Sequence, residues 1–145
     1  MSNYKTILVA IDINAHYDSI IRKALAISQS PEDLLLMYTS LPSTYIQPYL
    51  YGMEYNLITD AERMAVAHEK LADIAKKFGI AQQNIFVKLG FAADEIKEIA
   101  TEKSVDLIVM GTHGTSGIKL ILGSTANSVL HGAKQDVLAV RIQDV

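Results

Sequence analysis

Hydrophobic and polar positions follow two alternating spacings along this chain. Short runs that are apolar on both faces, such as TILVAI at residues 6–11 and LIVM at residues 107–110, are typical of parallel strands covered on both sides. Between these runs, apolar residues recur every three or four positions, as on one face of a helix. The pattern predicts strands over residues 5–12, 33–39, 84–90, 105–111 and 136–142. It predicts helices over residues 18–28, 59–78, 93–102 and 124–131.

The order of these elements predicts the fold class. Strands and helices alternate strictly, and this order is typical of an α/β protein with a doubly wound, five-stranded parallel sheet and four helices. The chain has 145 residues, the size of one domain, and neither an internal repeat nor a linker divides it. Residues 1–145 are therefore predicted to form a single domain.

The amino-acid composition excludes several classes of function. The net charge is −3 and no run is rich in lysine or arginine, so we expect neither nucleic acid nor a membrane surface as a partner. The chain has no cysteine, which excludes a disulfide framework and thiol catalysis. The N-terminus lacks a signal-peptide pattern, and no apolar run approaches the roughly 18 residues of a transmembrane span. We expect a cytoplasmic protein.

The unusual polar residues follow two of the predicted strands. Asp12 closes the first strand, and the fourth runs into VMGTHGTSGIKLILGST at residues 109–125, with glycines at positions 111, 114, 117 and 123. In doubly wound sheets, ligands bind beyond the carboxyl ends of the strands, where the strand order reverses. If the first and fourth strands are neighbours, Asp12 and the glycine loop face one crevice.

The glycine loop has the chemistry of an anion cradle. Glycines allow successive backbone N–H groups to turn toward a ligand, and a helix that begins at Ser124 adds its free N–H groups and partial positive charge. Hydroxyl donors stand at Thr112, Thr115, Ser124 and Thr125. The spacing matches neither the Walker loop nor the GxGxxG dinucleotide turn.

The segments KTILVAID, VDLIVMGTHG, GST and DVLAVRI together resemble the universal stress protein family over essentially the whole chain. In the ATP-binding branch of that family, the loop has Gly, two residues, Gly, nine residues, and then Gly-Ser or Gly-Thr. Here Gly111 and Gly114 are followed by eight residues before Gly123 and Ser124. The landmarks are present, but the spacer is one residue short, and this departure weakens the inference of ATP binding.

The resemblance implies an adenine-nucleotide alpha-hydrolase-like fold that binds ATP, with or without Mg²⁺. It implies that Asp12 bonds the ribose hydroxyls and that the backbone at Tyr38 contacts the adenine edge. Met110 and Gly111 would line the adenosine pocket. The phosphates would be surrounded by Gly114, Gly123, Ser124 and Thr125. The family also forms dimers through the last strand, which implies a homodimer through residues 137–142.

Several of these residues have simpler interpretations. Asp12 could cap a turn, as aspartates after strands often do, and Ser124 or Thr125 could be helix N-caps. His16 and His113 lie in the two loops, but no histidine pair has metal-ligand spacing, so we expect no metal site. The tyrosine-rich segment 44–58 is compatible with a lid, a partner surface or a flap packed on its own domain.

These observations favour a nucleotide-binding protein of stress response or signalling that passes its occupied state to protein partners. We expect at most slow hydrolysis or autophosphorylation and assign no catalytic residue, because fast phosphoryl transfer needs metal-holding carboxylates, a base and added cationic charge. The three arginines, Arg22, Arg63 and Arg141, lie outside both loops. The alternative is a dimeric interaction protein of the same fold that binds no nucleotide. The HxGH and SGGxDS motifs of related enzymes are absent from the sequence.

Overall fold

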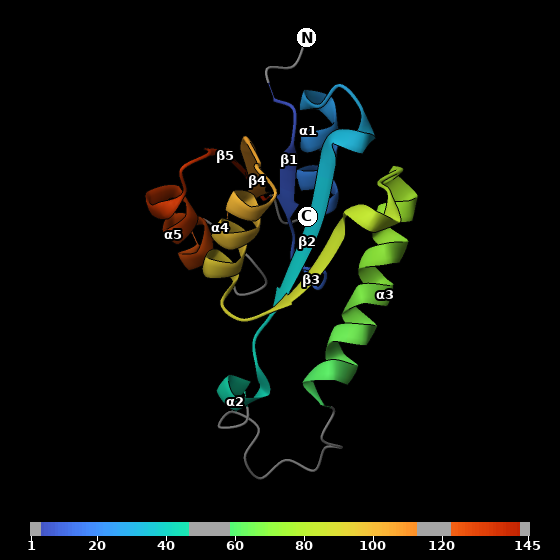
Figure 1. The fold of residues 1–145 in the computed structure, drawn as a ribbon, viewed down its shortest axis with the longest axis vertical. Helices are drawn as coiled ribbons and strands as arrows, with labels where there is room; N and C mark the ends of the chain where they lie inside the picture. The colour runs from blue at the N-terminus through green and yellow to red at the C-terminus, as the bar shows by residue number, and fades with distance from the viewer. Residues whose placement is uncertain (1–3, 47–58, 113–122, 143–145) are drawn as a thin grey trace.

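The computed structural model describes residues 4–46, 59–112 and 123–142. Five strands form one parallel sheet in the order β3-β2-β1-β4-β5 (Figure 1). The strands are β1 (Ile7–Ala10), β2 (Leu34–Ser40), β3 (Ile85–Leu89), β4 (Leu107–Gly111) and β5 (Asp136–Val140). The predicted parallel α/β sheet is therefore confirmed, and β1 and β4 are direct neighbours.

Four longer helices cover the two faces of the sheet (Figure 1). They are α1 (Asp18–Ile27), α3 (Asp60–Phe78), α4 (Ala92–Glu102) and α5 (Ser124–Gly132). Alternate residues of each strand face opposite sides: Val9 packs with α1 and α3, whereas Leu8 packs with α4 and α5. Burial on both faces explains why the central strands are apolar throughout.

The longest helix, α3, begins and ends at the residues that the sequence indicates. The Thr59 Oγ1 atom accepts a hydrogen bond from the Glu62 N–H at 3.1 Å, which satisfies one of the free donors of the first turn. Gly79 ends the helix in the left-handed conformation, with φ of 75°. A further four-residue helix, α2 (Ser43–Ile46), lies beyond the carboxyl end of β2 (Figure 1), where the sequence predicts a loop.

All five strands are parallel, so their carboxyl ends lie at the same end of the sheet (Figure 1). The loops after β1 and β4 leave from this end, and α3, α4 and α5 begin there. No helix in the part of the chain that the structure describes has the length and apolarity needed to cross a membrane.

Candidate functional site

The strand order reverses between β1 and β4, and this point is the expected place for a ligand crevice. The chain proceeds outward from β1 through β2 to β3 on one side, and from β4 to β5 on the other. Ala10 pairs with Met110 at the ends of the two strands. The same register, carried two residues further, places Asp12 level with Thr112, so the two predicted loops leave the sheet side by side.

Asp12 caps a turn and keeps one carboxylate oxygen available. Its Oδ1 atom accepts a hydrogen bond from the Asn14 N–H at 2.9 Å, and its carbonyl accepts one from the Ala15 N–H at 3.0 Å. Turn capping therefore occurs. The Oδ2 atom has no hydrogen-bond partner among the described residues, and the side chain is partly exposed. The carboxylate can hold the turn and still accept from a ligand.

The two ends of the glycine loop are joined at its base. The Gly123 N–H donates to the Thr112 carbonyl at 2.6 Å, and the Thr112 N–H donates to the Val140 carbonyl at 2.9 Å. The Thr112 hydroxyl oxygen also accepts from the Ile142 N–H at 3.3 Å. These bonds fix Thr112 to β5 and place the start of α5 directly beyond β4. Gly114 and the rest of residues 113–122 lie outside the described residues.

Helix α5 begins without a side-chain cap. Its N-cap is Gly123, so Ser124 and Thr125 are the first two helical residues, and the interpretation of either as the N-cap is wrong. Ser124 is exposed and Thr125 is partly exposed. The first backbone N–H groups of a helix have no acceptor within it, so this end can offer donors and partial positive charge to an anion.

Met110 and Gly111 end β4 in tightly packed surroundings. The Met110 side chain is 4% exposed and packs with residues of α4 and α5, so its backbone is the part near the crevice. A Cβ atom on Gly111 would lie 3.0 Å from the Cδ1 atoms of both Ile20 and Ile142. Close packing is therefore one reason for glycine at position 111, whatever its contact with a ligand.

Tyr38 lies near the carboxyl end of β2, two residues before the strand ends. The Met37 carbonyl accepts from the Ile11 N–H at 3.0 Å, so Met37 directs its peptide groups toward β1. Peptide groups alternate sides along a parallel strand, so those of Tyr38 face β3, and those of Thr39 face the β1 side, past the end of β1. The backbone edge nearest the crevice therefore belongs to Thr39, and Tyr38 contributes its side chain.

The Tyr38 phenol lies in a mixed electrostatic environment. Burial raises its pKa, and the negative charge of Asp12 raises it further. A side-chain hydrogen bond with Ser40 and the positive charge of Arg63 lower it. The net shift is upward, so the phenol is protonated at neutral pH and can donate a hydrogen bond.

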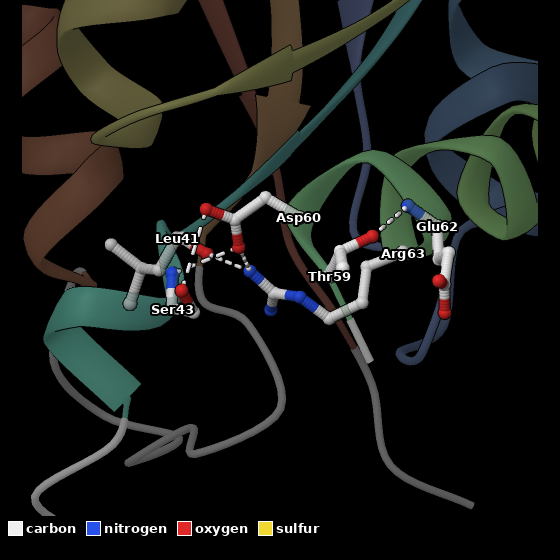
Figure 2. Close-up of polar contacts among 6 residues, drawn as sticks. All are labelled: Leu41, Ser43, Thr59, Asp60, Glu62 and Arg63. Carbon is white, nitrogen blue, oxygen red and sulfur yellow. Dashed lines mark hydrogen bonds and ion pairs between the residues drawn. The ribbon is translucent and has the colours of Figure 1, made fainter. Parts of the chain in front are cut away.

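A second polar cluster, which could not be found from the sequence, lies at the same end of the sheet, beyond the carboxyl end of β2 (Figure 2). The Arg63 Nη2 atom donates to the Leu41 carbonyl and to the Asp60 Oδ1 atom, both at 2.6 Å. The Ser43 N–H donates to Asp60 Oδ1 at 3.0 Å. These bonds tie the first turn of α3 to the residues that follow β2. We call Leu41, Ser43, Asp60 and Arg63 the polar clamp.

The polar clamp places an arginine near Tyr38, although Arg63 lies outside both predicted loops. The hydrogen bond from Arg63 holds the pKa of Asp60 below its usual value, against a smaller opposing effect of burial. The Arg63 Nε atom is buried and has no hydrogen-bond partner among the described residues. The acidic and basic pair three residues apart, at the start of a predicted helix, was the only sequence signal for this cluster.

Metal ligation receives no support from the described residues. They contain no group of three or more histidine, cysteine, aspartate or glutamate side chains that could hold a metal ion. His16 is exposed in the loop after β1, and His113 falls outside the described residues. The tyrosine-rich segment 44–58 is described only as far as Ile46.

Comparison with known proteins gives consistent matches over the whole chain. The family model described as the universal stress protein family matches residues 3–141. Universal stress protein A homolog 2 of Coxiella burnetii is 38% identical over 144 residues, which cover 99% of each chain. Universal stress protein G of Escherichia coli O157:H7 is 28% identical and covers 95% of this chain and 99% of its own.

Solved structures match the same fold. Universal stress protein UspA from Lactobacillus plantarum has a TM-score of 0.70 at 24% identity, with 97% of this chain and all of that chain covered. A universal stress protein in complex with cAMP has a TM-score of 0.56 at 26% identity, with 96% of this chain and 98% of that chain covered.

Proposed function

The chain belongs to the universal stress protein family, and from this membership and the geometry of the crevice we propose that it binds an adenine nucleotide beyond the ends of β1 and β4. The observation that carries the proposal is the meeting of three features at the strand-order reversal: the available Asp12 oxygen, the closed base of the glycine loop and the uncapped start of α5. The family member solved with cAMP supports the same ligand class.

ATP, with or without Mg²⁺, is the proposed ligand, and each part of it has a complementary group in the crevice. The backbone N–H groups at the start of α5, with the hydroxyls of Ser124 and Thr125, suit the phosphates. The Oδ2 atom of Asp12 suits a ribose hydroxyl, and the backbone at Thr39, beside Tyr38, suits the adenine edge. Met110 and Gly111 form the floor between them through their backbone.

The hydrogen bond between Gly123 and Thr112 bears on the short spacer. It holds the Gly123 nitrogen 2.6 Å from the carbonyl oxygen of Thr112, the residue that follows β4, so the spacer of eight residues between Gly114 and Gly123 suffices to return the chain to the crevice. We propose that Gly123 and Ser124 therefore reach the phosphates, and that Gly114 completes the cradle from within the loop.

We propose a signalling role in the stress response of the cytoplasm, with at most slow hydrolysis or autophosphorylation. Efficient phosphoryl transfer requires a positioned base and a cation on the transferred group. Arg63 lies beyond the carboxyl end of β2, and its Nη2 atom is already engaged by Asp60 and the Leu41 carbonyl. The protein would pass its occupied state to protein partners.

Replacing Ser124 by alanine is expected to weaken ATP and ADP binding about tenfold while leaving adenosine binding nearly unchanged. A hydrogen bond to a charged group is worth roughly 1.5–3 kcal/mol, and water competing at an exposed serine favours the lower value. Calorimetric titration with ATP, ADP and adenosine measures the effect.

Ser128→Ala is the matched control, because Ser128 is an exposed serine one turn further along α5. It should leave all three affinities unchanged. If Ser124→Ala weakens adenosine as much as ATP, with circular dichroism unchanged, the start of α5 does not hold phosphate.

We also propose a homodimer joined along the free edge of β5. The Val140 carbonyl faces β4, where it accepts from Thr112, so the alternation of peptide groups turns Val137, Ala139 and Arg141 outward. Ala139 is partly exposed, and apolar strand edges are commonly paired or covered.

Ala139→Pro is expected to shift the protein from dimer to monomer, because proline removes an outward N–H donor without breaking a β4–β5 hydrogen bond. Val87→Pro makes the same change at an outward position of the opposite edge strand, β3, and should leave the dimer intact. Light scattering at micromolar concentration measures both variants. A monomeric parent protein would refute this interface.

The short spacer favours one alternative function, an interaction protein of the same fold that binds no nucleotide. This alternative predicts the same dimer but no response to ATP, so the titrations above separate the two.

A further inference from the structure

The chain leaves β2 through two consecutive backbone carbonyls that other elements hold. The Ser40 carbonyl accepts a hydrogen bond from the Gly90 N–H at 2.9 Å, which ties it to the residue after β3. One residue further, the Leu41 carbonyl accepts from the Arg63 Nη2 atom at 2.6 Å, which ties it to α3. The neighbouring strand and helix therefore fix the backbone at the end of β2.

Thr39 immediately precedes these two residues, and its N–H and carbonyl groups face the β1 side, past the end of β1. Met37, two residues earlier, is fixed as well, because its carbonyl accepts from the Ile11 N–H at 3.0 Å. The orientation of the Thr39 backbone edge thus depends on bonds made before and after it along the chain. Arg63 makes one of these bonds.

The polar clamp holds the Arg63 guanidinium against the Leu41 carbonyl (Figure 2). The Asp60 Oδ1 atom accepts from the same Nη2 atom at 2.6 Å and from the Ser43 N–H at 3.0 Å. The carboxylate therefore joins the start of α3 to the residues after β2. Leu71, further along α3, is fully buried, so the helix is packed against the core and gives the clamp a fixed base.

The clamp is not the arrangement that stability alone would favour. The Arg63 Nε atom is buried and has no hydrogen-bond partner among the described residues. A buried donor without an acceptor lowers stability, and an apolar side chain of similar length would avoid that loss. The guanidinium is therefore better explained by what its contact with Leu41 positions than by a gain in folding.

A fixed backbone edge at Thr39 can distinguish purine bases. The N–H group of this edge donates and its carbonyl accepts. Adenine presents the N6 amino donor beside the N1 acceptor, whereas guanine presents the O6 acceptor beside the N1–H donor. With the sugar and phosphates held elsewhere, one orientation of the edge pairs with adenine and opposes guanine. A small movement of the backbone would weaken this discrimination.

We propose that Arg63 is a positioning residue of the nucleotide site: through the Leu41 carbonyl it fixes the Thr39 backbone edge that recognises adenine. This inference rests on the proposed nucleotide function. It assigns to the polar clamp the preference for adenine over guanine nucleotides, and it makes Arg63 act on binding of the base and not of the phosphates.

The test replaces Arg63 by methionine, which keeps an unbranched, helix-compatible side chain and removes every donor. Affinities for ATP and for adenosine are expected to fall by the same factor, about three- to tenfold, the size of one modest hydrogen bond. GTP affinity should not fall, so the preference of the parent for ATP over GTP should decrease. Calorimetric titration measures the three affinities, and circular dichroism checks the fold.

Arg63→Lys is the second variant. Its ammonium keeps the positive charge but ends one bond short of the Nη2 position, so the Leu41 contact should weaken and the preference for ATP should fall in the same direction. Arg22→Ala is the matched control. Arg22 is an exposed arginine of α1, with its guanidinium 5.4 Å from the centre of the Phe78 ring at the other end of α3. Its loss should leave all three affinities unchanged.

The outcomes separate this inference from the proposed function. If the parent binds ATP but neither folded variant of Arg63 changes the preference over GTP, the inference is overturned and the proposed function stands. A loss for ATP without a loss for adenosine would place the arginine on the phosphates, and an equal loss for ATP and GTP would make the clamp a general support. Either result overturns the inference. A parent that binds no ATP overturns both.

Discussion

Replacing Ile108 by alanine is expected to lower the free energy of unfolding by about 2–5 kcal/mol, the range for large-to-small substitutions in a packed core. Ile108 is fully buried in β4, paired with Leu8 on one side and Val137 on the other. Its side chain packs into the core formed with α4 and α5, so its loss leaves a cavity between sheet and helices. Urea denaturation measures the change.

Val66→Ala is the comparison for this variant. Val66 lies in α3 with 52% of its surface exposed, and truncating it should change the free energy of unfolding by less than about 0.5 kcal/mol. If Ile108→Ala costs no more than Val66→Ala, β4 is not a central strand covered on both faces, and the described sheet order is contradicted.

Asp12→Ala is expected to weaken ATP binding by about tenfold to over a hundredfold. The carboxylate bond to a ribose hydroxyl is charge-assisted and worth roughly 1.5–3 kcal/mol, at 1.4 kcal/mol per tenfold change in affinity. Because Asp12 also caps its own turn, Asp12→Asn is the sharper variant. Asparagine can still accept from the Asn14 N–H while the negative charge is lost. Titration calorimetry measures both.

Asp18→Ala removes a carboxylate without touching the crevice. Asp18 is exposed at the start of α1, 3.9 Å from Arg22 and 4.0 Å from Lys77, and its loss should leave ATP affinity unchanged at moderate salt. If Asp18→Ala and Asp12→Asn weaken ATP equally, the effect of Asp12 is one of net charge and not of contact with ribose.

The strands and helices could be predicted from hydrophobic periodicity. A strand that is buried on both faces is apolar throughout, and a helix that is buried on one face has an apolar residue every three or four positions. The first and last residues of these elements could not be predicted as accurately. The first strand was expected to begin at Lys5, but the N–H groups of Lys5 and Thr6 donate to the carboxylate of Asp106, at 2.9 and 3.1 Å. A side chain a hundred residues away thus takes the place of a strand neighbour.

Some residues of the candidate site could likewise be predicted from the sequence, and others could not. Asp12, Gly123 and Ser124 could be selected because they follow predicted strands or open a predicted helix. The adjacency of β1 and β4 could only be assumed, since right-handed crossovers do not fix strand order. Arg63 was missed because its partner at Leu41 is 22 residues away, across a segment with no strong period. The resemblance assigns Gly111 to the ligand site, and the close approach of Ile20 and Ile142 is a second reason for glycine there, which the sequence alone does not show.

Calorimetric titration of the nucleotide-stripped parent protein with ATP shows whether the crevice binds an adenine nucleotide. We expect saturable binding of one ATP per chain, displaced by ADP, with a matching thermal stabilisation of about 2.7 kcal/mol when free ATP reaches a hundred times its dissociation constant. No heat of binding and no stabilisation at millimolar ATP, with or without Mg²⁺, in a folded protein would contradict it.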